Sequence, residues 1–176
     1  LSGNQTYPEN VKIDRTFNNI LPAAMFSYKF SKTKNLNINY RTTTRSPSVS
    51  QLQNVIDISN PLQVKSGNAD LKQTFENNLT VRLGMGNHMA AKNFFIFLVA
   101  NQTSNYISNA TYLVRSDTSL QGYTINRGSQ LIKPVNLNNY YSLRTFGVYS
   151  FPLKPLRSNM NINGGYTFAH TPALIN

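Results

Sequence analysis

Residues 35–83 decide the fold: NLNINYRTTT (35–44) is followed by a polar loop (45–73) and then by TFENNLTVRLGM (74–85). Side chains of a β-strand point alternately to the two faces of a sheet, so a period of two gives one apolar and one polar face. Both flanking segments have this period, and their apolar set is Leu36, Ile38, Tyr40, Phe75, Leu79, Val81, Leu83 and Met85. Two interpretations follow. The apolar face covers a soluble core, or it faces lipid while the polar face lines a lumen.

The composition favours β-structure almost throughout. Hydrophobic residues make up 40% of the 176 residues, but charged residues only 13%, about half the usual share of a soluble domain. Amides and hydroxyls carry the polarity instead, which suits wet strand faces better than surface helices. The length fits one domain.

The net charge of +11 does not point to nucleic acid, because the basic residues are scattered singly and not gathered into a patch. The densest group, Lys29, Lys32 and Lys34, is expected at a tight turn. The absence of cysteine excludes disulfides, thiol catalysis and cysteine metal sites. The sequence shows no initiator Met and no basic-then-apolar leader at its start, so we expect a processed chain or a piece of a longer one.

No segment has the length of a transmembrane helix. The longest apolar run, 94–100, is far shorter than the roughly 20 residues that such a helix needs, although strands of about ten residues span a membrane. This run is apolar on both faces. In a sandwich it would be the most buried strand, and in a barrel its lumen side would be covered by a plug or a loop.

Further strands are expected at 19–30, 93–107, 139–151 and 158–171, with a bend or bulge at Gly164–Gly165. Residues 1–19 show no sustained period and are predicted to be irregular. The long loop is expected to hold short helical turns at 48–55. A second long excursion (101–139) is expected to hold short strands at 110–115 and 121–126 around a turn at 117–119.

The connections alternate strictly between short (31–34, 86–92, 152–157) and long (45–73, 101–139). All short turns therefore lie at one end of the sheet and all long loops at the other. Transmembrane barrels have this asymmetry, whereas soluble sandwiches mix loop lengths at both ends. The predicted fold class is all-β: an antiparallel meander of about 6–8 strands, forming a segment of a transmembrane β-barrel.

The run YRTTTRSPSVSQLQNVIDISNPLQVKSGNADLKQTFENNLTVRL (40–83) resembles the barrel region of TonB-dependent receptor-like outer-membrane proteins of Bacteroidetes type. The matching positions are Tyr40, Arg41, Pro47, Ser48, Gln51, Leu52, Asn60, Pro61, Gly67, Asn68 and Leu71. Ala69 replaces the usual proline. The segments 27–41, 134–152 and 160–176 are also similar to the family, so the resemblance covers most of the chain.

This resemblance implies an outer-membrane location, lipid as a partner and long loops facing outward. It also implies that residues 1–176 are a single segment of a larger barrel, which would have about 22 strands, a plug domain and TonB-type energy coupling. The implied function is uptake of an unidentified ligand such as a glycan or a siderophore. Two alternatives stay open: a plugless structural or adhesive barrel, and a soluble β-sandwich binding module.

No enzymatic constellation is present, because the six acids are not spaced as acid–base pairs. The lone His88 and His170 are expected at a surface or interface, and no catalytic residue, metal or cofactor is predicted. The ligand-binding candidates are Arg41, Arg82 and Arg144, near the middle of strands. The first two lie on the polar face. They would bind an anionic group. The alternative is a structural role, in which they hydrogen-bond to a plug or to neighbouring strands.

The tyrosines of the second long loop are a further candidate set, namely Tyr106, Tyr112 and Tyr123. They would stack on a sugar or siderophore. The alternatives are that they pack the loop or belong to an interfacial girdle with Tyr28, Tyr40 and Tyr166.

Overall fold

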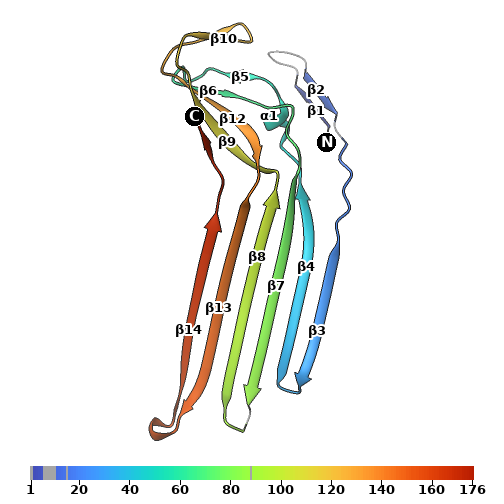
Figure 1. Ribbon diagram of the computed structural model, residues 1–176, viewed down its shortest axis with the longest axis vertical. Coiled ribbons are helices and arrows are strands. Elements are labelled where there is room, and N and C mark those ends of the chain that lie inside the picture. Colours follow the sequence, from blue (N-terminus) through green and yellow to red (C-terminus); the bar gives the residue numbers. More distant parts are fainter. Residues whose placement is uncertain (1, 6–10, 15, 88) are drawn as a thin grey trace.

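The computed structural model describes residues 2–5, 11–14, 16–87 and 89–176. Six long antiparallel strands form one sheet in the order β14-β13-β8-β7-β4-β3, each next to its neighbour in the chain (Figure 1). The strands are β3 (Ala23–Ser31), β4 (Lys34–Arg45), β7 (Thr74–Asn87), β8 (Lys92–Ser104), β13 (Tyr140–Leu153) and β14 (Ser158–His170). We call this the spanning sheet. The predicted all-β meander is confirmed.

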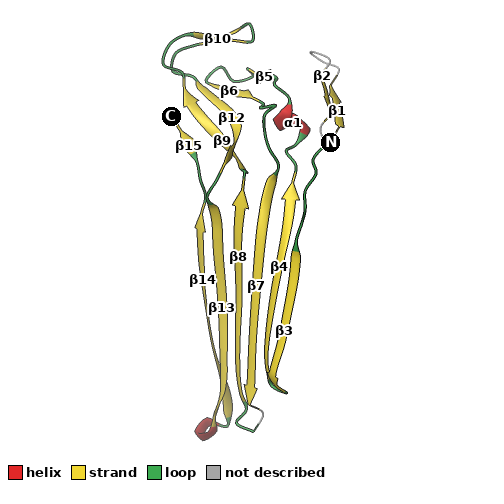
Figure 2. Cartoon of the chain, turned by 45° about the vertical axis from the view of Figure 1, so that its right-hand side comes forward, coloured by secondary structure: helices red, strands yellow, loops and turns green. Residues whose placement is uncertain are grey.

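Short and long connections lie at opposite ends of the spanning sheet, as predicted (Figure 2). Only residues 32–33 separate β3 from β4. A 3₁₀ turn, η1 (Lys154–Leu156), joins β13 to β14 and ends at Arg157, whose φ of 46° is left-handed. None of the helices in the described part of the chain is long and apolar enough to cross a membrane.

The strand register sorts side chains onto two continuous faces. Phe26 pairs with Ile38, and the same row continues through Val81 and Leu98 to Thr145 and Tyr166. Directly paired residues point to the same side of a sheet. The apolar alternation of each strand therefore builds one apolar face across the sheet, and the polar residues build the other.

The two long connections, together with residues 174–175 after β14, form a second sheet beyond the loop end of the first, in the order β15-β9-β12-β6-β5. Its strands are β5 (Ile56–Asp57), β6 (Gln63–Ser66), β9 (Tyr106–Leu113), β12 (Gln130–Leu137) and β15 (Leu174–Ile175). The parallel pairing of β6 with β12 joins the first long loop to the second. A helical turn, α1 (Val49–Leu52), and a hairpin of β10 (Thr118–Leu120) and β11 (Tyr123–Ile125) complete what we call the loop layer.

The buried apolar side chains of the described chain lie in the loop layer and not in the spanning sheet. They are Leu52, Ile56, Val64, Leu71, Ala110 and Ile125. Reciprocal hydrogen bonds fasten the two loops: Lys72 N donates to Asn136 Oδ1 (2.7 Å), and Asn136 Nδ2 donates to the Lys72 carbonyl (3.0 Å). Asn68 Nδ2 also donates to the Pro134 carbonyl at 2.9 Å. The loop layer is thus a folded unit with its own core.

The helical turn predicted at 48–55 is confirmed as α1. Ser48 and Gln51 form a reciprocal capping box at its start, which satisfies amides that the first helical turn leaves unbonded.

Three local predictions are wrong. Residues 1–19 are not wholly irregular, because β1 (Ser2–Gln5) pairs with β2 (Val11–Asp14). The turn of the second loop lies at Gln121–Gly122, where both φ angles are positive (51° and 83°), as a two-residue hairpin loop requires. Asp117 instead accepts a hydrogen bond from Arg127 N at 2.7 Å.

The third correction concerns the expected bend or bulge at Gly164–Gly165. Pairing with β13 runs through both glycines without a shift in register. A Cβ on Gly165 would lie 3.0 Å from the Thr145 carbonyl oxygen, so this glycine allows close approach of the neighbouring backbone.

Candidate functional site: the polar wall of the spanning sheet

The three predicted arginines all lie on the polar face of the spanning sheet. Arg41 pairs with Asn78, in a row that continues to Asn101. Arg144 pairs with Val99 and Thr167. Arg82 pairs with Asn37 on one side and Phe97 on the other. Arg144 therefore joins the two arginines that alternation had already placed on this face.

The structure does not gather these arginines into one cluster. Arg82 and Arg144 stand on strands separated by β8, which is a lateral distance of about 10 Å at a strand spacing of about 5 Å. Arg41 and Arg82 lie on adjacent strands, but Arg41 pairs with Asn78, four residues from Arg82. The offset along the strand is then about 14 Å. The arginines spread positive charge over the wall, and they do not form a single anion clamp.

An apolar strip interrupts the polar face between the arginines. It consists of Phe95, Phe97, Val99, Phe146 and Val148, of which Phe95 and Phe146 are 39% and 42% exposed. Phe97 pairs directly with Phe146. The guanidinium carbon of Arg82 lies 5.3 Å from the Phe97 ring centre, which is within cation–π range.

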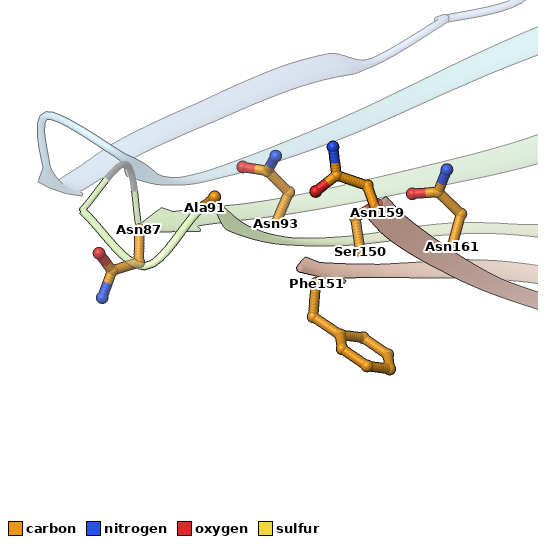
Figure 3. Close-up of a pocket in the computed structure, with 7 residues that line it drawn as sticks. All are labelled: Asn87, Ala91, Asn93, Ser150, Phe151, Asn159 and Asn161. Carbon is orange, nitrogen blue, oxygen red and sulfur yellow. The ribbon is translucent and has the colours of Figure 1, made fainter. Parts of the chain in front are cut away.

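Asparagines line a hollow of about 440 Å³ near the short turns. Figure 3 shows that Asn93, Asn159 and Asn161 point to one side of the sheet, whereas Phe151 points to the other. Asn93 and Asn161 both pair with Ser150, which places these amides on the polar face. The hollow is a neutral, hydrogen-bonding part of the wall.

The opposite, apolar face is bounded by polar groups at both ends. At the loop end, Tyr40 Oη donates to Asn77 Oδ1 (2.7 Å) and Asn77 Nδ2 donates to Gln102 Oε1 (2.6 Å). At the turn end, Asn87 pairs with Lys92. Asn77 and Asn87 are about 34 Å apart along β7, or about 26 Å in height at a strand tilt of about 40°. This matches the roughly 25 Å apolar band of a transmembrane barrel.

Most side chains between these boundaries are apolar; they are half-buried on the inner strands β4, β7 and β8 and most exposed on the edge strands β3 and β14. Phe26, Tyr28, Ile162 and Tyr166 are each 50% exposed or more. A polar wall on one side and an exposed apolar band on the other define a segment of a transmembrane β-barrel.

The chain belongs to the outer membrane protein beta-barrel family, whose model matches residues 1–174. It is therefore an outer-membrane β-barrel protein, located in the bacterial outer membrane. The polar wall faces the lumen and the apolar face contacts lipid. No curated protein and no solved structure matches the chain.

The tyrosines of the second loop do not form a common site. Tyr106 stacks on Tyr140, with ring centres 4.6 Å apart, and Tyr112 is half-buried in β9. Tyr123 is 44% exposed beside the β10–β11 turn. Packing therefore accounts for Tyr106, whereas Tyr123 leaves part of its ring exposed to solvent.

Of the two histidines, His88 lies outside the described residues. His170 is exposed, stacks on Tyr141 at 4.9 Å and has Nδ1 2.8 Å from the Asn139 carbonyl oxygen. Within the described chain, no group of three histidine or acidic residues is placed to hold a metal ion.

The asparagine hollow is a feature that the sequence patterns did not predict. Its signal was available, because Asn159, Asn161 and Asn163 alternate with apolar residues. What the sequence could not show is that Asn93, some 66 positions before Asn159, lies on the same wall.

Proposed function

We propose that this chain forms part of the wall of a TonB-dependent receptor, a plugged outer-membrane transporter that takes up an unidentified ligand such as a glycan or siderophore. The protein is proposed to bind and transport, and not to catalyse a reaction. The sequence motif over residues 40–83 is similar to that of TonB-dependent receptors of Bacteroidetes type, and this similarity supports the proposal.

The apolar strip is the observation that carries the proposal. Phenylalanine rings on the lumen side would meet water in an open pore, at a cost of about 25 cal/mol for each Å² of apolar surface left exposed. A plug domain inside the barrel would cover Phe95, Phe97 and Phe146. The neighbouring arginines would then pair with acids of the plug or with an anionic group of the ligand.

The open single sheet also supports a larger barrel. β3 and β14 each have a neighbour on one side only, and an unpaired strand edge is a template for further pairing. We propose that both edges continue into other strands of the complete barrel wall.

The second candidate is a plugless structural or adhesive barrel, which the folded loop layer favours because it offers a preformed outer surface. The soluble sandwich does not fit. In a sandwich two sheets pack face to face, whereas the loop layer continues from the end of the spanning sheet (Figure 2).

Cysteine labelling separates the two candidates, since residues 1–176 contribute no native cysteine and any cysteine elsewhere in the complete protein is first changed to serine. In the complete protein, Phe97→Cys should resist a hydrophilic maleimide while the plug is present and should label once the plug segment is deleted. Tyr123→Cys in the loop layer should label in both forms, and lipid-facing Leu98→Cys in neither. Rapid labelling of Phe97→Cys in the complete protein would favour the plugless barrel.

Energy coupling needs its own test. Cells that lack the TonB-type coupling protein should lose uptake of a ferric siderophore or oligosaccharide that the complete protein imports, while surface binding remains. Undiminished uptake would contradict TonB dependence.

A further inference from the structure

Charge is distributed unequally between the two ends of the molecule. Five cationic residues lie in or beside the three short turns, namely Lys32, Lys34, Lys92, Lys154 and Arg157, and all five are exposed. The acids whose side chains the structure describes lie elsewhere, in the loop layer or in the loop half of β7: Asp57, Asp70, Glu76 and Asp117. The turn end is thus purely basic over the described residues.

Two of these cations stand on the lipid side of the wall. Lys34 pairs with Met85, and Met85 pairs with Phe94, so all three share the apolar face. Lys92 lies on the same face two residues before Phe94. A lysine at this boundary lays its aliphatic stem along the apolar surface and holds its ammonium at headgroup depth.

Exposed apolar side chains accompany the cations. Met89 is fully exposed, Leu156 is 72% exposed and Phe30 is 58% exposed. Each belongs to one of the three turns or borders it. Proteins bind anionic membrane surfaces through apolar side chains that enter the interface beside cationic side chains. A soluble acidic partner would require the cations but not the exposed apolar side chains.

The spacing fits a row of lipids. Six strands at about 5 Å intervals spread the turns over about 25 Å. The cations are therefore separated by distances comparable to the Debye length of about 8 Å at physiological salt, and they act together on neighbouring headgroups.

We propose that the turn end of this protein binds the headgroups of anionic phospholipids in the periplasmic leaflet, with Lys34 and Lys92 as the main contacts. Short turns of outer-membrane barrels face the periplasm. The contact would anchor the barrel at a fixed depth. It depends on the membrane location of the chain and not on what the protein transports.

Native mass spectrometry of the complete protein in detergent tests this proposal. Bound phosphatidylglycerol is counted against phosphatidylcholine, which has no net charge. The native protein should prefer phosphatidylglycerol. The double variant K34Q/K92Q should bind it about 25-fold more weakly, since each surface cation contributes about fivefold.

Two matched variants complete the design. K65Q/K133Q removes the same charge from the loop layer and should leave phosphatidylglycerol binding within twofold of the native value. K34R/K92R keeps the charge and should also retain binding. Electrophoresis with and without heating checks the folding of K34Q/K92Q, because a misfolded barrel would lose its heat-dependent change in migration.

The proposal is overturned by equal losses in K34Q/K92Q and K65Q/K133Q, which would make net charge the cause. Unchanged binding in K34Q/K92Q, or no preference for phosphatidylglycerol in the native protein, would also overturn it. If K34Q/K92Q instead loses only its affinity for a soluble polyglutamate peptide, the basic end is a docking site for an acidic protein.

Discussion

Val64 in the loop layer is 2% exposed, whereas Ile162 in the spanning sheet is 52% exposed. Both are β-branched residues in strands whose side chains alternate. The loop layer excludes water by packing side chains on one another, with Ile56, Val64 and Ile125 at its centre. The spanning sheet excludes water by placing its apolar face in lipid. The same alternating pattern therefore occurs in strands that pack against a protein core and in strands that face lipid. The lengths of the connections, and not the pattern itself, indicate which strands belong to which region.

If the loop layer has the only packed apolar core among the described residues, removing a buried side chain there should have the largest effect. Ile125→Ala should destabilise the loop layer by about 2–5 kcal/mol, because a cavity remains beside Ile56 and Val64. Leu98→Ala in the spanning sheet should cost less, since lipid fills the space. Hydrogen exchange checks this: amides of β6, β9 and β12 should exchange about 30-fold faster or more in Ile125→Ala. Similar losses in both variants would remove the distinction.

The faces of β8 can be compared with neighbouring substitutions. Leu98→Arg puts a charge on the lipid side and should destabilise the barrel by about 2–4 kcal/mol. Val99→Arg points into the lumen and should cost well under half of that. The yield of folded protein in the outer membrane and its denaturant midpoint measure both. A larger loss for Val99→Arg would reverse the assignment of the faces.

Alanine substitutions at two glycines compare the packing density of the loop layer with that of the spanning sheet. A Cβ on Gly67 would lie 1.7 Å from the Gln53 carbonyl oxygen in the tightly packed loop layer. Gly67→Ala should therefore cost about 1–3 kcal/mol through overpacking. Gly164→Ala is the control, because nothing lies within 4 Å of its Cβ. Thermal unfolding of the loop layer should shift in the first variant only, and a matching shift in the second would contradict the packing argument.

The smallest expected effect is electrostatic and confined to the loop layer. Hydrogen bonds from Ser59 Oγ (2.6 Å) and Ser59 N (3.0 Å) hold the pKa of Asp57 below its ordinary value of 3.8. A depressed folded-state pKa stabilises the turn above the unfolded value, and this contribution is lost as pH falls through the folded value. Ser59→Ala should raise the pKa of Asp57 toward its ordinary value in an NMR titration, whereas Ser50→Ala should not.

The spanning sheet could be predicted from the sequence because its information is local. Alternation in 35–44 and 74–85, together with strictly alternating connection lengths, was enough to place its strands and their faces. Arg41 and Arg82 were assigned to the polar wall on the same grounds.

The loop layer could not be predicted in detail, because its contacts are distant in sequence. The pairing of β6 with β12 joins Val64 to Leu131, and no local period signals such a contact. Pro134 also argues against a strand at 130–137, since proline cannot donate a ladder hydrogen bond. Here its carbonyl accepts one from Asn68 instead. The apolar strip was partly foreseen from 94–100, but its Phe146–Val148 half depends on the register of β13.

A cysteine scan along β8 tests the central assignment of faces most directly. Residues 94–100 are changed to cysteine one at a time in the complete protein, spin-labelled, and reconstituted in lipid with a lipid-soluble relaxation agent. Relaxation should alternate with a period of two, strong at the lipid-facing positions 94, 96, 98 and 100 and weak at the lumen-facing positions 95, 97 and 99. The opposite phase, or no period at all, would contradict the assignment of faces.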